Sequence, residues 1–222
     1  MKPALVLLHG ALGSASHWQA TKTLLENDYT VYTPDFPGHG KSALSAPAQI
    51  INLVDYLVSY LEEHQLHEPF IAGYSMGGYV SLMAVLRRDL KLSKLVCLAT
   101  KMHWSPLIAD EEASKLNPQI LQAILPKLEA EHGPNFPALL DSTASILRTI
   151  GAHPLSVSEL EKHSTTCVFI RGEKDKMVSA EENLQFREAS KHVTYIEMPA
   201  QGHLLEKMDA PTVANLFKQV FQ

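Results

Sequence analysis

Basic charge, cysteine and long apolar runs are all scarce in this chain of 222 residues. The formal net charge is −5 and no run of lysine and arginine occurs, which argues against nucleic acids and anionic membrane surfaces as partners, because both attract basic patches. No segment approaches the ~18 apolar residues that a membrane-spanning helix needs. The first apolar run, Ala4–Leu8, leads directly into His9-Gly10 and is too short for the core of a signal peptide. We therefore expect a cytoplasmic protein with no nucleic-acid or membrane partner.

Only two cysteines are present, and each lies in a short apolar run: Cys97 in LVCLA and Cys167 in TCVFI. This setting is typical of buried, reduced thiols in neighbouring strands, and a disulfide or a reactive thiol is the less common alternative. The paired histidines of many metal sites are missing as well, because no second histidine lies at i+3 to i+5 from any histidine between residues 101 and 163. These histidines are His103, His132, His153 and His163. We expect these histidines to be solvated or to face a substrate, and we expect no metal or cofactor.

Short apolar runs alternate with longer amphipathic stretches along most of the chain. The runs are apolar throughout, which is typical of strands that helices cover on both faces. Helix-like stretches such as Ile50–His64 and Tyr79–Arg88 separate most of them. The pattern predicts a parallel, doubly wound α/β sheet with ligands at the carboxyl ends of its strands. The six predicted strands are Ala4–Leu8, Thr30–Thr33, Phe70–Gly73, Lys94–Ala99, Thr166–Arg171 and Val193–Met198.

The alternation stops between residues 101 and 163, where no strand-like run occurs. A plain connection between two strands needs far fewer residues. We therefore expect residues 101–163 to form a helical lid over the strand ends, with residues 1–100 and 164–222 forming the core. Asn117-Pro118 signals the start of one helix in this segment, and Pro126 either begins another or kinks the first before Gly133. A further helix is expected from Pro137 to Ile150, before Gly151, and a capping box of Ser156 and Glu159 signals a fourth.

The motif with the most specific chemistry is Gly73-Tyr74-Ser75-Met76-Gly77-Gly78. It follows one predicted strand and precedes a predicted helix, which is the setting of a nucleophile elbow. So tight a turn requires glycine two residues before and two residues after the serine, because side chains there would clash. The strained turn exposes the serine hydroxyl, and the N-terminus of the helix favours developing negative charge. For the motif taken alone, a glycine-rich turn without chemistry is the alternative.

A serine becomes an effective nucleophile only beside a base that a third group orients. His203 follows the last predicted strand, and Asp175 follows the strand before it. All three residues therefore follow the carboxyl ends of parallel strands, where they can meet in one crevice. We predict Ser75 as the nucleophile, His203 as the base and Asp175 as the acid behind it, with Glu173 as the competing acid.

Five segments in this order resemble the small-lid branch of the α/β-hydrolase superfamily: LLHGALGSASHW, DFPGHGKS, GYSMGG, RGEKDKMVS and PAQGH. Esterases, thioesterases, perhydrolases and carbon–carbon bond hydrolases share this pattern, which leaves only the lid unmatched. The order Ser…Asp…His is that of the superfamily. Gly172 and Asp175 fit its G-x-x-D loop, which favours Asp175 over Glu173. The other position that some relatives use for the acid reads Thr100-Lys101-Met102 here and offers no carboxylate.

The resemblance also implies an oxyanion hole, which in this fold uses one backbone N–H after the nucleophile and one from the loop after the HG strand. These groups belong to Met76 and Ala11, and His9 is then a structural residue of that loop. Members usually have two further strands before the HG strand, and this chain lacks them. The resemblance therefore implies a six-stranded, wholly parallel sheet with the run Val31–Pro34 at an edge, and an uncovered edge suggests a homodimer.

The sequence gives weaker signals for the residues that line the substrate pocket than for the triad. Tyr74 and Met76 flank the nucleophile and are expected at the pocket wall. The segment after the fourth strand either lines an acyl or aryl pocket or packs inside the lid; its residues are Met102, His103, Trp104, Leu107 and Ile108. Gly38–Ser42 resembles the end of a phosphate-binding loop, but position 35 is Asp35 where that loop needs glycine, so nucleotide binding is rejected.

Together these features predict a serine hydrolase that cleaves a small or medium ester or thioester through an acyl-enzyme. Serine rather than aspartate at position 75 argues against the dehalogenase and epoxide hydrolase variants of the superfamily. Two alternatives stay open: a carbon–carbon bond hydrolase or lyase with the same triad, and a ligand receptor of the same fold with slow turnover.

Overall fold

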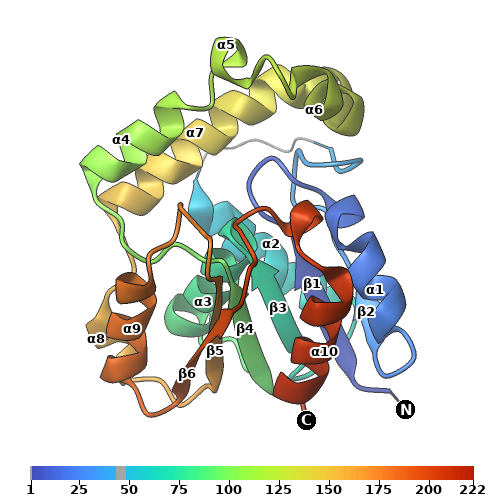
Figure 1. Ribbon diagram of the computed structural model, residues 1–222, viewed down its shortest axis with the longest axis vertical. Coiled ribbons are helices and arrows are strands. Elements are labelled where there is room, and N and C mark those ends of the chain that lie inside the picture. Colours follow the sequence, from blue (N-terminus) through green and yellow to red (C-terminus); the bar gives the residue numbers. More distant parts are fainter. Residues whose placement is uncertain (1, 44–48) are drawn as a thin grey trace.

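A single parallel sheet of six strands lies at the centre of the computed structural model, which describes residues 2–43 and 49–222 (Figure 1). The strand order is β2-β1-β3-β4-β5-β6, and every neighbouring pair is parallel. The predicted α/β fold is confirmed, and the ends of each strand differ from the predicted ends by at most one residue. The strands are β1 (Ala4–Leu8), β2 (Thr30–Tyr32), β3 (Phe70–Tyr74), β4 (Lys94–Leu98), β5 (Cys167–Gly172) and β6 (Val193–Met198).

Helices cover both faces of the sheet, which explains why its inner strands are apolar throughout. On β1, Val6 and Leu8 pack in one core cluster, whereas Leu5 and Leu7 pack in the other, and all four are fully buried. The first cluster joins the sheet to α2 (Ile50–Glu63), α3 (Met76–Arg88) and α9 (Ala180–Ala189). The second joins it to η1 (Ala15–Trp18), α1 (Gln19–Leu25), η3 (Leu205–Lys207) and α10 (Ala210–Val220).

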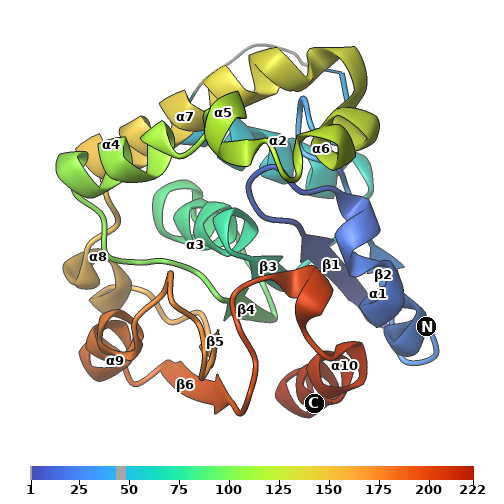
Figure 2. The ribbon, with the colours of Figure 1, turned by 45° about the horizontal axis from the view of Figure 1, so that its top comes forward.

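The segment between β4 and β5 is helical, as predicted, and most of it forms a layer above the sheet (Figure 2). Asn117, Pro126, Gly133 and the Ser156–Glu159 capping box mark helix ends as expected. One further helix begins after the N-cap Ser105, where none was predicted. The helices are α4 (Pro106–Ser114), α5 (Pro118–Leu121), α6 (Leu125–His132), α7 (Phe136–Ala152) and α8 (Val157–Glu161), with the short η2 (Gly133–Asn135) between α6 and α7.

The helix α8 lies apart from that layer, beside α9, in both views of the ribbon (Figures 1 and 2). Arg87 of α3 holds this end of the insertion: its guanidinium forms an ion pair with Glu159 and donates to the carbonyl of Pro154. Only α4 to α7 therefore lie above the sheet. We call these four helices the helical cap.

The two cysteines and the edge strands also take their predicted places. Cys97 and Cys167 are buried, free thiols on the paired strands β4 and β5, and burial raises the pKa of Cys167 to about 12. β2 and β6 are the edges of the sheet, and pairing of β2 with a second copy stays a prediction. Among the residues that the structure describes, no helix is long and apolar enough to cross a membrane.

Candidate active site

Ser75 lies in a strained turn between β3 and α3. Its backbone has φ 50° and ψ −114°, a conformation that non-glycine residues rarely adopt. The end of β4 fixes the turn from one side, because the Ser75 N–H donates to the carbonyl of Leu98 at 2.8 Å. The first turn of α3 fixes it from the other, because the Ser75 carbonyl accepts from Gly78 and Tyr79. This is the geometry of a nucleophile elbow.

Glycine on either side of the serine is a steric requirement. A Cβ on Gly73 would overlap backbone atoms of Gly77 and Gly78. A Cβ on Gly77 would lie 2.6 Å from the carbonyl oxygens of Leu8 and His9. Because all these neighbours are backbone atoms inside the fold, no side-chain rotation can relieve the clash.

We expect Gly73→Ala to lower the free energy of unfolding by about 3 kcal/mol, the upper part of the range for overpacking a rigid site. Urea unfolding monitored by circular dichroism measures this change. Gly202→Ala is the matched control, since a Cβ there meets no atom within 4 Å and should change stability little. Equal stability of the two variants would contradict the steric argument.

Asp175 and His203 form the best-defined part of the site. His203 Nδ1 and Asp175 Oδ2 are 2.8 Å apart, and the other carboxylate oxygen accepts the N–H groups of Met177 and Val178 at 2.8 and 3.0 Å. Burial by itself would raise the pKa of Asp175, but these hydrogen bonds, led by that from His203, outweigh it and hold the pKa below its ordinary value. The ionised acid thus keeps the proton on Nδ1 and leaves Nε2 of His203 free to act as a base.

Glu173, the competing acid, makes a different contact. Its Oε2 accepts the N–H of Ala200 at 2.8 Å and so fixes the loop that leads to His203. Of the two carboxylates, Asp175 is the one that contacts the imidazole of His203.

The imidazole of His203 lies beside the elbow. Its ring centroid is 5.5 Å from that of Tyr74, the residue before Ser75. Within the described residues the Ser75 hydroxyl and His203 share no hydrogen bond of their own, and such contacts commonly tighten when substrate binds. The structure therefore brings the three predicted residues to one region, and the hydrogen bond between His203 and Asp175 is already formed there.

His9 is a structural residue, as predicted. It is fully buried, its Nε2 accepts the N–H of Phe36 at 3.0 Å, and its Nδ1–H donates to the carbonyl of Gly10 at 2.8 Å. These bonds connect the loop after β1 to the loop after β2. In the described part of the chain, no protein acceptor is found for the N–H groups of Ala11 and Met76, and their use as an oxyanion hole stays a prediction.

The buried histidines predict a loss of stability in mild acid. Burial lowers the pKa of His9 to about 4, from an ordinary 6.5, and the nearby His17 and His132 lower it further, against the opposing Gly10 carbonyl and Glu131. Burial also holds the pKa of His39 well below its usual range. The unfolded chain therefore binds more protons than the folded chain between these values, and the folded state loses stability as the pH falls through that window.

For His9 alone, the free energy of unfolding should fall by about 3 kcal/mol between pH 7 and pH 4, at 1.36 kcal/mol per pKa unit. Urea unfolding at a series of pH values measures it. His9→Gln, which keeps an acceptor for Phe36, should flatten the slope, whereas the exposed His103→Gln should leave it unchanged. Equal stability at pH 7 and pH 4 would refute the prediction.

The predicted pocket residues fall into different environments. Tyr74 is 7% exposed and lies between Gly10 and His203. Met102 is buried in the main core, and Leu107 is 70% exposed. Trp104 packs against the core with its indole N–H on the Lys101 carbonyl. Of the residues expected at the pocket wall beside Ser75, Tyr74 lies near His203, whereas Met76 is 5% exposed and packs in the main core. Asp175 also lines an open cleft of about 720 Å³, together with residues that include Lys101, His103, Ile108 and Lys176.

Sequence reasoning missed two polar residues that contact the site's loops. Glu182 of α9 is 3% exposed and accepts the N–H groups of Met102 and His103, which connects α9 to the start of the insertion. His132, expected to be solvated or to face substrate, is 4% exposed and hydrogen bonded to core loops. That expectation is wrong for His132, because α6 packs the imidazole ring of His132 against the loops after β1 and β2. The S-x-x-E pattern of Ser179 and Glu182 signals a helix start, but not these contacts.

Comparison with known proteins identifies a matching family, two partial relatives and a similar structure. The profile of the alpha/beta hydrolase family matches residues 5–214. The pimeloyl-[acyl-carrier protein] methyl ester esterase of Vibrio vulnificus is 32% identical over 130 residues, 58% of this chain and 48% of the esterase. Ethanol acetyltransferase 1 of Hanseniaspora uvarum is 33% identical over 86 residues, 38% of this chain and 26% of that protein.

The matched parts thus cover about half or less of these relatives. In structure, NosK from Streptomyces actuosus superposes with a TM-score of 0.84 over 99% of this chain and 97% of NosK, at 20% identity. The likeness to NosK shows the shared fold, and the family profile spans nearly the whole sequence. This chain belongs to the alpha/beta hydrolase family.

Proposed function

We propose that this protein is a serine hydrolase that cleaves a small or medium ester or thioester. The observation that carries the proposal is the 2.8 Å hydrogen bond between Asp175 and His203 beside the strained turn of Ser75. A buried carboxylate behind an imidazole, next to a serine held on an elbow, is the arrangement that acyl transfer requires.

In the proposed mechanism, Nε2 of His203 removes the hydroxyl proton of Ser75 as its oxygen attacks the substrate carbonyl. Asp175 keeps the imidazole in the required tautomer and stabilises its cation. The N–H groups of Ala11 and Met76 stabilise the negative charge on the carbonyl oxygen. The protonated imidazole then gives its proton to the leaving alcohol or thiol, and water, activated by the same histidine, releases the acid.

The names of the relatives support acyl chemistry. One relative is named as a methyl ester esterase and the other as an ethanol acetyltransferase, and both names describe the transfer of an acyl group. The free N–H groups of Ala11 and Met76 fit a carbonyl oxygen that becomes negatively charged.

A panel of p-nitrophenyl esters from acetate to decanoate tests the proposal. Turnover of one of them above about 1 s⁻¹, the lower end of typical enzyme rates, supports it. Turnover far below that value, together with a rise in melting temperature on adding an ester, would instead indicate a ligand receptor. Absence of both effects would contradict the proposal.

A further inference from the structure

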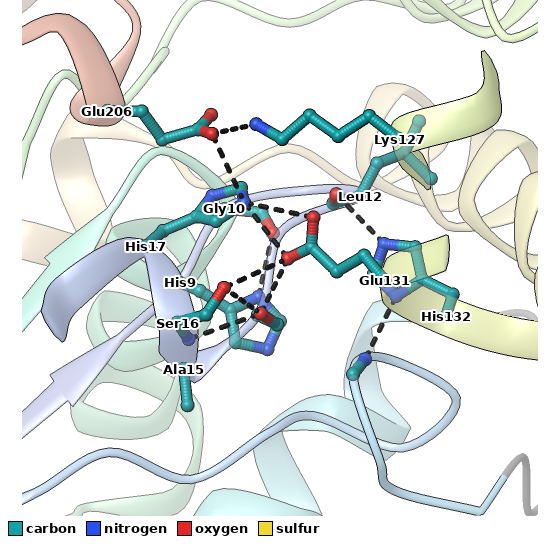
Figure 3. Close-up of polar contacts among 12 residues, drawn as sticks. His9, Gly10, Leu12, Ala15, Ser16, His17, Lys127, Glu131, His132 and Glu206 are labelled. Atoms are coloured by element: carbon teal, nitrogen blue, oxygen red, sulfur yellow. Dashed lines mark hydrogen bonds and ion pairs between the residues drawn. The ribbon is translucent and has the colours of Figure 1, made fainter. Parts of the chain in front are cut away.

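The helix α6 contacts the core through three polar residues. His132 binds the loops after β1 and β2, Glu131 binds the turn that begins η1, and Lys127 forms an ion pair with Glu206, which follows His203 by three residues. Figure 3 shows Glu131 and His132 beside the segment that carries Gly10, Leu12, Ser16 and His17, and Lys127 reaching Glu206. A helix of the cap is thus joined to the loops on both sides of the proposed site.

His132 uses both ring nitrogens. Its Nδ1 accepts the N–H of Gly40 at 2.9 Å, so the proton lies on Nε2, which donates to the carbonyl of Leu12 at 3.1 Å (Figure 3). One neutral tautomer therefore satisfies both bonds. The ring also stacks on Phe136, with an interplanar angle of 10°, and meets His39 edge-on. Packing and hydrogen bonds together hold the ring in one orientation.

The residue that His132 binds is itself strained. Leu12 has φ 52°, a conformation that costs a non-glycine residue of order 1 kcal/mol. Inside the loop, the hydrogen bond from Gly13 N–H to the Gly10 carbonyl closes the turn. Ala11, whose N–H is a proposed oxyanion donor, lies within this turn. The hydrogen bond from His132 therefore stabilises the turn that orients the N–H group of Ala11.

Glu131 supports the same loop from its other end. Its carboxylate accepts from the Ser14 hydroxyl at 2.5 Å and lies 3.0 Å from Nε2 of His17. Ser14 is the N-cap of η1, so the segment that follows the oxyanion loop is held as well. Glu131 and His132 are adjacent on α6, and docking of this one helix makes both sets of contacts together.

We propose that His132 is a positioning residue that holds the oxyanion loop in its reactive geometry, so that the site is complete only when α6 is docked on the core. The part of His132 in turnover rests on the proposed function, whereas its stabilising contact with the loop of Gly10 to Gly13 does not. His132 touches no reacting atom and acts through the turn of Gly10 to Gly13. Through His132, a helix of the cap thus takes part in the geometry of the site.

Kinetics of three substitutions at position 132 test the proposal. His132→Ala should lower kcat about 10- to 100-fold, the range for a misaligned catalytic donor, with KM changed by less than about threefold because ground-state contacts persist. The amide of Gln reaches the place of Nε2, whereas that of Asn stops at the place of Nδ1. His132→Gln should therefore retain more activity than His132→Asn, and Glu129→Gln, an exposed change on the same helix, should match wild type. Equal losses for Gln and Asn would contradict the role of the Leu12 contact.

Hydrogen–deuterium exchange separates the loop contact from catalysis. In His132→Ala, amides of residues 10–17 should exchange at least about tenfold faster, as expected when a local opening is eased, while those of α10 keep their rates. Unchanged exchange in residues 10–17 would overturn the proposal whatever the kinetics show. If wild-type protein hydrolysed no ester, the proposed function and the role in turnover would fail together, and the exchange rates would still decide whether His132 holds the loop.

Discussion

Replacing Ser75 by alanine is expected to lower kcat by roughly 10³-fold or more, because the covalent acyl-enzyme can no longer form. The fold should stay intact, since the Ser75 contacts that fix the turn are made by its backbone N–H and carbonyl. Steady-state turnover of the best p-nitrophenyl ester measures the change, and the melting temperature checks the fold.

A fluorophosphonate probe gives an independent readout of the same prediction. It should label wild-type protein and Ser114→Ala, an exposed serine change in the cap, but not Ser75→Ala. Near-normal turnover or labelling of Ser75→Ala would show that another residue is the nucleophile.

Replacing Asp175 by asparagine is expected to lower kcat by roughly 10²- to 10⁴-fold, which is the second large effect. The carboxylate at 2.8 Å from His203 Nδ1 keeps the proton on that nitrogen. An amide can present its own N–H there instead, which moves the imidazole proton to Nε2 and removes the base that Ser75 needs. Because Asn can still accept the N–H groups of Met177 and Val178 through its oxygen, the loop should keep its shape.

Glu173→Gln is the matched control for this loss. Its carboxylate accepts the N–H of Ala200, a bond that the amide oxygen of Gln can also accept, so kcat should stay within about threefold of wild type. The reverse ranking, with Glu173→Gln inactive and Asp175→Asn active, would make Glu173 the acid and overturn the assignment.

The strands could be predicted from local sequence because each inner strand is buried on two faces. All side chains of Leu5 to Leu8 lie in one or the other core cluster, so the run is apolar throughout and easily recognised. The helix starts at Asn117 and Ser156 were readable for a similar reason, since a cap acts within its own turn. Ser105-Pro106 carries the same signal as Asn117-Pro118, and α4 was missed although its start was marked.

The sequence by itself determined the positions of the strands along the chain, the strained turn at Ser75 and the three side chains placed after strand ends, because these follow from burial, local sterics and chain order. Only the tertiary structure decided that Asp175 rather than Glu173 contacts His203, that Met102 is a core residue, and that His132 binds Leu12. These outcomes depend on contacts between residues distant in the chain, such as the 120 positions between Leu12 and His132. No local pattern records which distant loop a histidine will meet, because packing of the whole cap places it there.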